Sequence, residues 1–167
     1  MSRRGVLMAG VAGAAAAAGL GWGLWRGRGP APEQLVWQAT LKGLDGEAVP
    51  LTRWQGRPLL LNFWATWCPP CVREMPVFDR FHKQRSAQGW QVVGVAIDKA
   101  DAVRQFLTRQ PVSYPILLAG LEAAELMQAL GNLQGGLPFT VLLDAAGHVK
   151  QRHLGETTET QLTSWAV

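Results

Sequence analysis

"LLLNFWATWCPPCVREMP", residues 59–76, contains both cysteines of the 167-residue chain. The stretch begins as a continuous apolar run, which is typical of a buried strand, and then changes to a helical spacing that predicts a helix over 69–87. Residues 90–98, "WQVVGVAID", predict a second buried strand. Strand, helix and strand in this order predict a βαβ unit, because two parallel strands need a crossover connection.

The segments on both sides of this unit predict the rest of an α/β domain. Upstream, residues 35–54 alternate between apolar and polar around Asp45-Gly46, which predicts a β-hairpin that caps one edge of the sheet. We expect five strands of mixed direction with helices on both faces, and in such sheets the chemistry gathers at the carboxyl ends of strands. The downstream pattern predicts helices over 100–110, 121–132 and 157–167, a strand over 113–119 and a hairpin over 138–154.

The N-terminal region predicts a membrane segment. Residues 5–25 carry no charge, and as a helix they would span ~31 Å, close to the thickness of a bilayer core. An uncleaved signal anchor, a cleaved signal peptide and a buried helix are all compatible with this pattern, and the first two export the domain. We expect a signal anchor over 1–26, a Gly/Pro-rich tether over 27–34 and one folded domain over 35–167.

The distribution of charge argues against a nucleic-acid partner. The chain has a net charge of +4, with 16 basic and 12 acidic residues. The first 30 residues contain four arginines and no acid, so the remaining charges balance. A neutral folded part without a basic stripe is not typical of a protein that binds nucleic acid.

The two cysteines differ in their expected chemistry. Pro69 suits the first turn of a helix, which places Cys68 at the helix N-terminus, where free amides and the helix dipole favour a thiolate. Cys68 is therefore the expected nucleophile. Cys71 lies one turn further along and can attack a mixed disulfide that Cys68 has formed with a substrate.

Two further residues of this helix matter for the site. Glu74 lies three residues after Cys71, so its carboxyl group can exchange the proton of a cysteine, or it is simply an acid stabilised by the early turns of the helix. Spacing alone leaves both readings open. Pro76 cannot donate to the Val72 carbonyl and is expected to kink the helix.

A zinc site and a structural staple are the alternatives to a redox pair. Zinc needs four ligands, whereas one C-x-x-C supplies two and the three histidines show no ligand spacing. A disulfide across so short a loop stabilises the fold little. The βαβ context therefore favours a redox couple without metal or other cofactor.

Two segments resemble the membrane-anchored, thioredoxin-like TlpA/ResA-type thiol-disulfide oxidoreductases. Residues 59–76 are similar to the active-site segment of that family, and "GGLPFTVLLDAAGHV", residues 135–149, resembles its second signature, a Leu-Pro-x-Thr strand. The resemblance covers residues 35–165. It implies a thioredoxin fold with an N-terminal β-hairpin extension and a central strand-helix insertion over 112–132.

The resemblance also implies roles for individual residues. Cys68 is the nucleophile and Cys71 the resolving thiol, and Glu74 falls on the position of the family's active-site acid. The substrate-binding positions that it implies are Trp67, which flanks the pair, and Leu137 and Pro138, where Pro138 matches a cis-proline that faces the disulfide.

Two departures from related proteins limit what can be transferred. Asn62 stands where cytosolic thioredoxins have a buried Asp, so Glu74 is expected to take over its proton relay. Phe139 stands where members that act in cytochrome c maturation usually have Glu, which weakens an assignment to the haem pathway.

The resemblance implies a single-pass protein of the bacterial inner membrane with its catalytic domain in the periplasm. Its expected activity is a protein-disulfide reductase, with disulfide-bearing exported proteins as clients and a membrane thiol donor of the DsbD/CcdA type. A dithiol oxidase of the same fold and a copper(I) chaperone are the alternatives, although related copper proteins use C-x-x-x-C. A peroxidase fits less well, because Ala65 stands where such enzymes have Thr.

Overall fold

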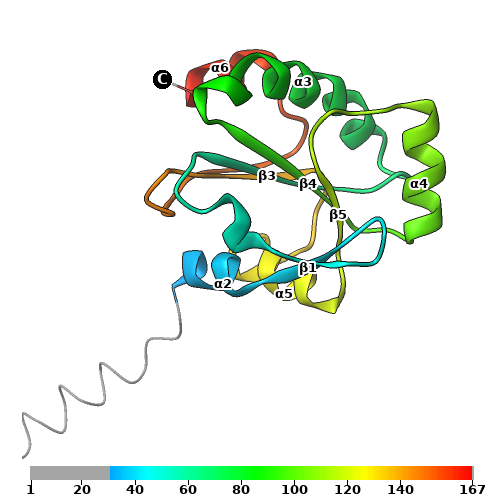
Figure 1. Cartoon of the computed structure of the whole chain (residues 1–167), viewed down its shortest axis with the longest axis horizontal. Helices are drawn as coiled ribbons and strands as arrows, with labels where there is room; N and C mark the ends of the chain where they lie inside the picture. The colour runs from blue at the N-terminus through cyan, green and yellow to red at the C-terminus, as the bar shows by residue number, and fades with distance from the viewer. Residues whose placement is uncertain (1–30, 167) are drawn as a thin grey trace, which may run out of the picture. The chain divides into compact units, whose positions relative to one another are not determined.

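The computed structural model describes residues 31–166, and the predicted anchor over 1–26 lies outside this range. Residues 32–166 lie in one compact unit. Among residues 31–166, no helix combines the length and apolar character that crossing a membrane requires. The elements, shown in Figure 1, are α2 (Pro32–Gln38), β1 (Thr40–Gly43), β2 (Ala48–Pro50), η1 (Leu51–Trp54), β3 (Leu59–Trp64), α3 (Pro69–Arg85), η2 (Ser86–Gln88), β4 (Gln91–Ala96), α4 (Ala100–Arg109), β5 (Ile116–Leu118), α5 (Leu121–Ala129), β6 (Phe139–Leu143), β7 (Val149–Leu154) and α6 (Glu159–Trp165).

The predicted βαβ unit forms the centre of the domain. Strands β3 and β4 pair in parallel, with Asn62 opposite Gly94, and α3 connects them. Strand β5 continues the parallel part beside β4, while β6 pairs antiparallel with β3 and β7 with β6. These pairings confirm the mixed sheet, the C-terminal hairpin and the inserted strand-helix, which is β5 and α5.

The sheet is larger than the five strands expected. It has seven strands in the order β2-β1-β5-β4-β3-β6-β7, because the N-terminal hairpin joins the sheet instead of only capping it. Strand β1 pairs antiparallel with β5 through Lys42–Leu118 and Gly43–Leu117. The inserted strand β5 therefore links the hairpin to the parallel strands.

Helices cover both faces of the sheet, as predicted, and each face has its own apolar core (Figure 1). Every residue of β3 is buried. Its odd-numbered residues, such as Leu61, pack with residues of α2, η1 and α5. Leu60 and Trp64 point to the other face and pack with residues of α3, α4 and α6, in the same cluster as both cysteines.

The expected extent of the N-terminal hairpin was wrong. Residues 32–38 form the helix α2 and residues 51–54 a short 3-10 helix, so only Thr40–Gly43 and Ala48–Pro50 are strands. Tertiary packing explains the difference, because Val36 is fully buried in the core and the Trp37 indole donates a hydrogen bond to the Gly147 carbonyl. The apolar residues that alternate over 35–39 therefore serve a helix that packs on the domain.

Pro76 lies inside α3, as predicted, and the structure shows what replaces the lost hydrogen bond. The Gln110 side chain, at the end of α4, donates its Nε2 to the Val72 carbonyl at 3.0 Å. The carbonyl that Pro76 leaves without its helical partner is thus bonded from a neighbouring helix.

Candidate active site

The two cysteines form a disulfide at the start of α3. Cys68 is the N-cap residue with an extended backbone, and its sulfur accepts a hydrogen bond from the Cys71 amide at 3.3 Å. Its bond to Cys71 has an Sγ–Sγ distance of 2.02 Å. Cys68 is 5% exposed, whereas Cys71 is fully buried. The assignment of Cys68 as the sulfur that meets a substrate stays a prediction.

The loop before Cys68 is anchored to the end of β4. Asp98, two residues after β4, accepts hydrogen bonds from the Thr66 amide at 3.2 Å and from the Thr66 hydroxyl. Partial burial would raise the pKa of Asp98, but the hydrogen bonds from Thr66 and Lys99 hold it below its ordinary value. Asp98 therefore stays ionised and fixes the approach to the cysteines. Neither Thr66 nor Asp98 was predicted from the sequence, although an Asp at the carboxyl end of a buried strand is a usable signal.

Glu74 lies fully buried, at the centre of a cluster of polar side chains. One carboxyl oxygen accepts from Asn62 Nδ2 at 2.7 Å, and the other accepts from the Thr157 amide at 2.6 Å. Asn62 Nδ2 also donates to the Thr140 hydroxyl at 3.0 Å, which is 3.3 Å from the Thr157 hydroxyl. The cluster joins α3, β3, β6 and the loop before α6.

The surroundings of Glu74 raise the pKa of its carboxyl group to near neutral. Burial raises the pKa of Glu74 from an ordinary 4.5 to about 7, although the hydrogen bonds from Thr157 and Asn62 oppose that rise. A group with such a pKa can both accept and release a proton under physiological conditions. The sequence identified Glu74, and Asn62 as a departure from thioredoxins. It placed Thr140 in the Leu-Pro-x-Thr signature without assigning it a contact, and it did not point to Thr157.

The second signature forms the loop that leads into β6. The Leu137–Pro138 peptide bond is cis, as the resemblance implied. The buried Pro138 accepts a hydrogen bond at its carbonyl from the Gly155 amide at 2.8 Å. Leu137 packs against the apolar cluster that contains both cysteines. Trp67, next to Cys68, is 66% exposed. The roles of Trp67, Leu137 and Pro138 in substrate binding remain predictions.

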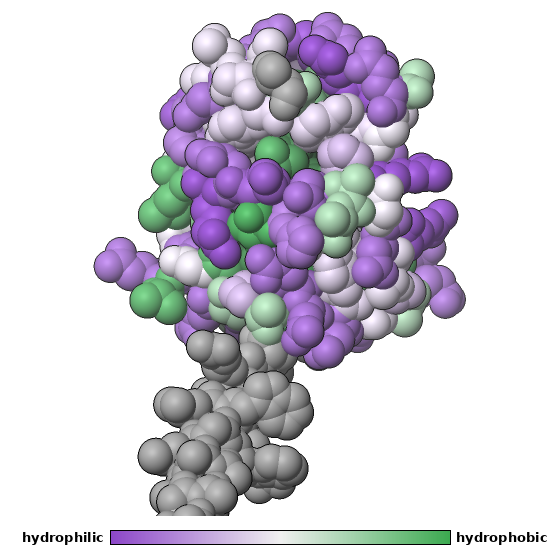
Figure 2. Space-filling model, turned by 90° about the vertical axis from the view of Figure 1, so that its left-hand side faces the viewer, coloured by the Kyte–Doolittle hydropathy of each residue, from purple (hydrophilic) through white to green (hydrophobic). Residues whose placement is uncertain are grey.

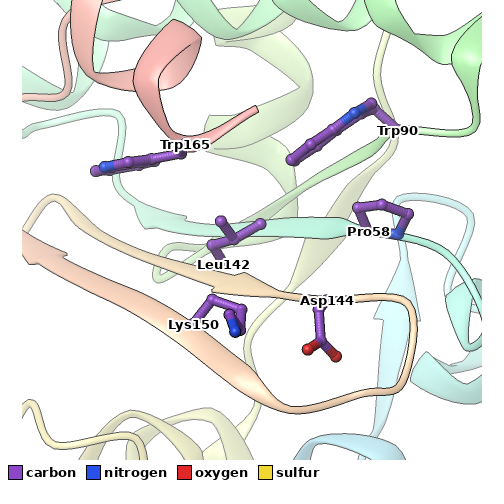
Figure 3. A pocket seen from close by; sticks show the side chains of 6 residues that line it. All are labelled: Pro58, Trp90, Leu142, Asp144, Lys150 and Trp165. Carbon is purple, nitrogen blue, oxygen red and sulfur yellow. The ribbon is translucent and has the colours of Figure 1, made fainter. Parts of the chain in front are cut away.

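A cavity of about 190 Å³ lies elsewhere in the domain. Figure 3 shows the rings of Trp90 and Trp165 on one side of this cavity. The charged side chains of Asp144 and Lys150 lie on the opposite side, and Leu142 lies between the two groups. Its sixth lining residue, Pro58, precedes β3, whereas Cys68 follows the other end of that strand. None of the predicted site residues lines this cavity, so it is not the candidate active site.

The surface at the side of the β6–β7 turn is largely hydrophilic. Figure 2 looks at the left-hand side of Figure 1, where this turn lies. Hydrophobic residues are visible there as separate small areas, and some of them lie in a hollow near the centre. Exposed areas of this size are ordinary for a soluble domain.

Comparisons with known proteins identify the family. Residues 30–165 match the protein family described as Redoxin. The thiol-disulfide oxidoreductase ResA of Halalkalibacterium halodurans is 33% identical over 130 residues, which cover 77% of this chain and 71% of that protein. The thioredoxin-like protein YneN of Bacillus subtilis is 33% identical over 129 residues, covering 74% and 71%.

Solved structures show the same fold. A thioredoxin-related protein from Neisseria meningitidis serogroup B is 36% identical with a TM-score of 0.67, covering 74% of this chain and 93% of that one. A putative thiol:disulfide interchange protein DsbE from Chlorobium tepidum is 27% identical with a TM-score of 0.66, covering 77% and 88%.

Proposed function

The chain belongs to the redoxin family as a thioredoxin-like, ResA-type member, and from this premise we propose that it reduces disulfides of exported proteins while tethered to the outer face of a bacterial inner membrane. The predicted family, fold and enzyme class are confirmed: the chain is a thiol-disulfide oxidoreductase of the ResA/DsbE type. The observation that carries the proposal is the Cys68–Cys71 pair at the N-terminus of α3, with the buried Glu74 on the same helix.

The proposed reaction begins with the reduced protein. The Cys68 thiolate attacks one sulfur of a client disulfide, so a mixed disulfide forms and the other client sulfur leaves as a thiolate that takes up a proton. Cys71 then loses its proton and attacks Cys68, which closes the Cys68–Cys71 disulfide and releases the second client thiolate. The client gains two electrons and the enzyme loses two.

Glu74 is the proposed acceptor for the proton of Cys71. Cys71 is fully buried, so water does not reach its thiol freely. Glu74 lies one helical turn further along α3, and its pKa of about 7 lets it take up a proton at neutral pH. When a donor later reduces the disulfide, the same carboxyl group can return that proton to Cys71.

The loop that contains the cis-proline is the proposed site for the client backbone. Within residues 31–166, no backbone hydrogen bond uses the amide or the carbonyl of Leu137. An extended client segment can pair with these groups as an added strand does. The exposed Trp67 ring offers apolar contact area next to the nucleophile.

The location and the electron donor are proposed from the sequence. An uncharged segment over 5–25 suits a signal anchor. The structure begins the folded unit at Pro32, so the tether is limited to the residues after the anchor and before α2, which would let the domain stand off the membrane. A membrane thiol donor of the DsbD/CcdA type would then re-reduce the Cys68–Cys71 disulfide after each turnover.

Two cysteine variants test the mechanism. Cys68→Ser is expected to abolish reduction of insulin disulfides by the full-length protein, and retained activity would show that Cys68 is not the nucleophile. Cys71→Ser is expected to accumulate mixed disulfides with client proteins, visible as bands that disappear on reduction. If Cys71→Ser traps nothing while Cys68→Ser is inactive, the assigned division of labour between the cysteines is wrong.

A measured reduction potential tests the direction. A reductase is expected to show a potential well below about −200 mV, whereas strong oxidants of this fold lie near ~−120 mV. The value, obtained by equilibration with glutathione buffers, therefore separates the proposed reductase from a dithiol oxidase.

A further inference from the structure

Two consecutive residues of α3 are held by two consecutive residues of the loop between β7 and α6. Arg73 donates from Nε at 3.0 Å and from Nη2 at 2.6 Å to the same carboxylate oxygen of Glu156. Glu74 accepts from the amide of Thr157 at 2.6 Å. The two contacts join the same two segments, one at the surface and one in the interior.

Burial changes sharply between these two pairs of residues. The side chains of Arg73 and Glu156 are 60% and 38% exposed, whereas Glu74 is fully buried and Thr157 is 1% exposed. The loop segment 155–158 supplies Thr157 as a direct partner of the Glu74 carboxyl group. The ion pair therefore lies at the outer edge of the cover that separates Glu74 from water.

We propose that the Arg73–Glu156 ion pair is a clamp that holds loop 155–158 over Glu74 and keeps its carboxyl group dry. Arg73 and Glu156 are then positioning residues, since they act on the reaction only through Glu74. The catalytic consequence rests on the role of Glu74 proposed above, whereas the structural effect on Glu74 does not.

If the ion pair is a clamp, its loss should shift the pKa of Glu74 in the direction opposite to the shift that a lost charge alone would cause. Burial is the largest cause that raises the pKa of Glu74, so opening the loop and admitting water should lower that pKa toward 4.5. Opening the loop also breaks the Thr157 hydrogen bond, which favours the carboxylate, but the admitted water replaces that donor, so the loss of burial decides the sign. Removing the positive charge of Arg73, by contrast, can act through space only by raising it, because Glu156 is left uncompensated beside a second carboxylate. The two explanations predict shifts of opposite sign.

Other charged or titratable groups near Glu74 are unchanged by a substitution at Arg73. The phenol of Tyr114 interacts electrostatically with Glu74 from the loop before β5. The His153 ring lies 3.3 Å from the Glu156 carbonyl, at the end of β7. Asn62 and Thr140, which approach from β3 and β6, do not titrate.

The test is the titration of Glu74 in the full-length oxidised protein carrying Arg73→Gln. Carbon-13 labelling of glutamate carboxyl groups allows each midpoint to be followed by NMR, and the signal missing in Glu74→Gln identifies Glu74. We expect the midpoint in Arg73→Gln to fall from about 7 by ~1 pH unit. An unchanged or raised midpoint overturns the proposal.

A matched control exists on the same helix. Arg80 pairs with Glu159 of α6 at 3.2 Å, also at the surface, but within residues 31–166 the side chains of this pair make no hydrogen bond to Asn62 or Thr157, the partners of Glu74. Arg80→Gln should therefore leave the midpoint of Glu74 unchanged. An equal fall in Arg80→Gln would show a general effect of lost surface charge and would also overturn the proposal.

A double variant also distinguishes opening of the loop from a purely electrostatic effect of the two charges. In Arg73→Gln/Glu156→Gln the clamp is still open, so the midpoint should stay as low as in the single variant or lower. If the two charges act only through space, their removal together returns the midpoint to about 7.

The catalytic readout is the pH profile of insulin reduction. If ionised Glu74 accepts the proton of Cys71, insulin reduction should begin to rise at a lower pH in Arg73→Gln. The shift in pH should equal the shift of the NMR midpoint. A midpoint that moves while the pH profile does not confirms the clamp and contradicts the role of Glu74. If the proposed function itself is wrong, a different measurement shows it: Cys68→Ser then retains insulin reduction.

Discussion

Glu74 is a fully buried carboxyl group, and burying such a group is costly unless its charge is removed or well paired. Its hydrogen-bond partners are an amide side chain, Asn62, and a backbone N–H, that of Thr157, and neither carries a charge. Burial favours the protonated form, whereas these two donors favour the carboxylate without outweighing burial. A residue kept for packing alone would serve better as an apolar side chain, so the arrangement argues for a function in proton exchange.

The stability of the oxidised protein should fall as pH rises through the range in which Glu74 ionises. The unfolded chain ionises Glu74 near 4.5 and the folded protein near 7, so the folded state binds more protons between these values. The contribution is fully present below about 4.5 and lost above about 7, and it amounts to roughly 3 kcal/mol for a difference of this size. Urea denaturation at pH 5 and pH 8 measures it.

Glu74→Gln provides the comparison for that measurement. The variant has no proton to lose at this site, so its stability between pH 5 and 8 should lack the fall seen in the natural sequence. Equal pH dependence in the two proteins would show that Glu74 is already ionised at pH 5 in the folded state.

The residues of the site that could be predicted from the sequence are close together along the chain. Cys68, Cys71 and Glu74 lie within two helical turns, so their spacing alone places them on one helix. Thr140 and Thr157 could not be found in this way, because they lie 78 residues from Asn62 and 83 residues from Glu74, respectively. Thr140 belongs to the Leu-Pro-x-Thr signature, but the signature does not show that its hydroxyl contacts Asn62, and nothing in the local pattern at Thr157 distinguishes it from a surface residue.

At the scale of elements, helix α3 depends on its neighbour α4. Pro76 removes one hydrogen bond within α3, and Gln110 supplies the Val72 carbonyl with another. The sequence predicted the missing bond, because it follows from proline chemistry. It could not predict the partner, since that requires knowing that the end of α4 packs beside Val72. The helix α2 was not predicted for the same reason, because its apolar residues can be assigned to the core only when their tertiary contacts are known.

The dependence of α3 on Gln110 can be measured with a double-mutant cycle. Gln110→Ala should lower the free energy of unfolding by about 1 kcal/mol, because a partly buried carbonyl loses its bond. In the Pro76→Ala background residue 76 regains an N–H that can donate to Val72, so the same Gln110→Ala change should cost close to nothing. Equal costs in both backgrounds, by urea denaturation, would show that Gln110 acts through something other than this carbonyl.

At the scale of the whole molecule, strand β3 contributes side chains to both apolar cores, and the loop that follows it leads to Cys68. Strand β3 is buried on both faces and pairs with β4 and β6, so the loop that follows it begins from a rigid base. The parallel pairing of β3 with β4 and the β6–β7 hairpin were predicted from the βαβ pattern and the C-terminal hairpin pattern, whereas the pairing of β6 with β3 was not. The joining of the N-terminal hairpin to β5 was not predicted either, because both segments are short and their pairing is decided by tertiary contact.

The direction of the reaction should appear in the stability of the entire domain. By linkage, a disulfide that is harder to reduce in the folded protein than in the unfolded chain stabilises the folded state on oxidation, by about 1.4 kcal/mol for every ~30 mV. A reductase is expected to be more stable when oxidised, whereas a strong oxidant is more stable when reduced. Urea denaturation of the full-length protein with and without a thiol reductant should therefore give the higher midpoint for the oxidised form. The double variant Cys68→Ser/Cys71→Ser should show the same midpoint in both conditions, and a higher midpoint for the reduced natural sequence would assign the domain to oxidation.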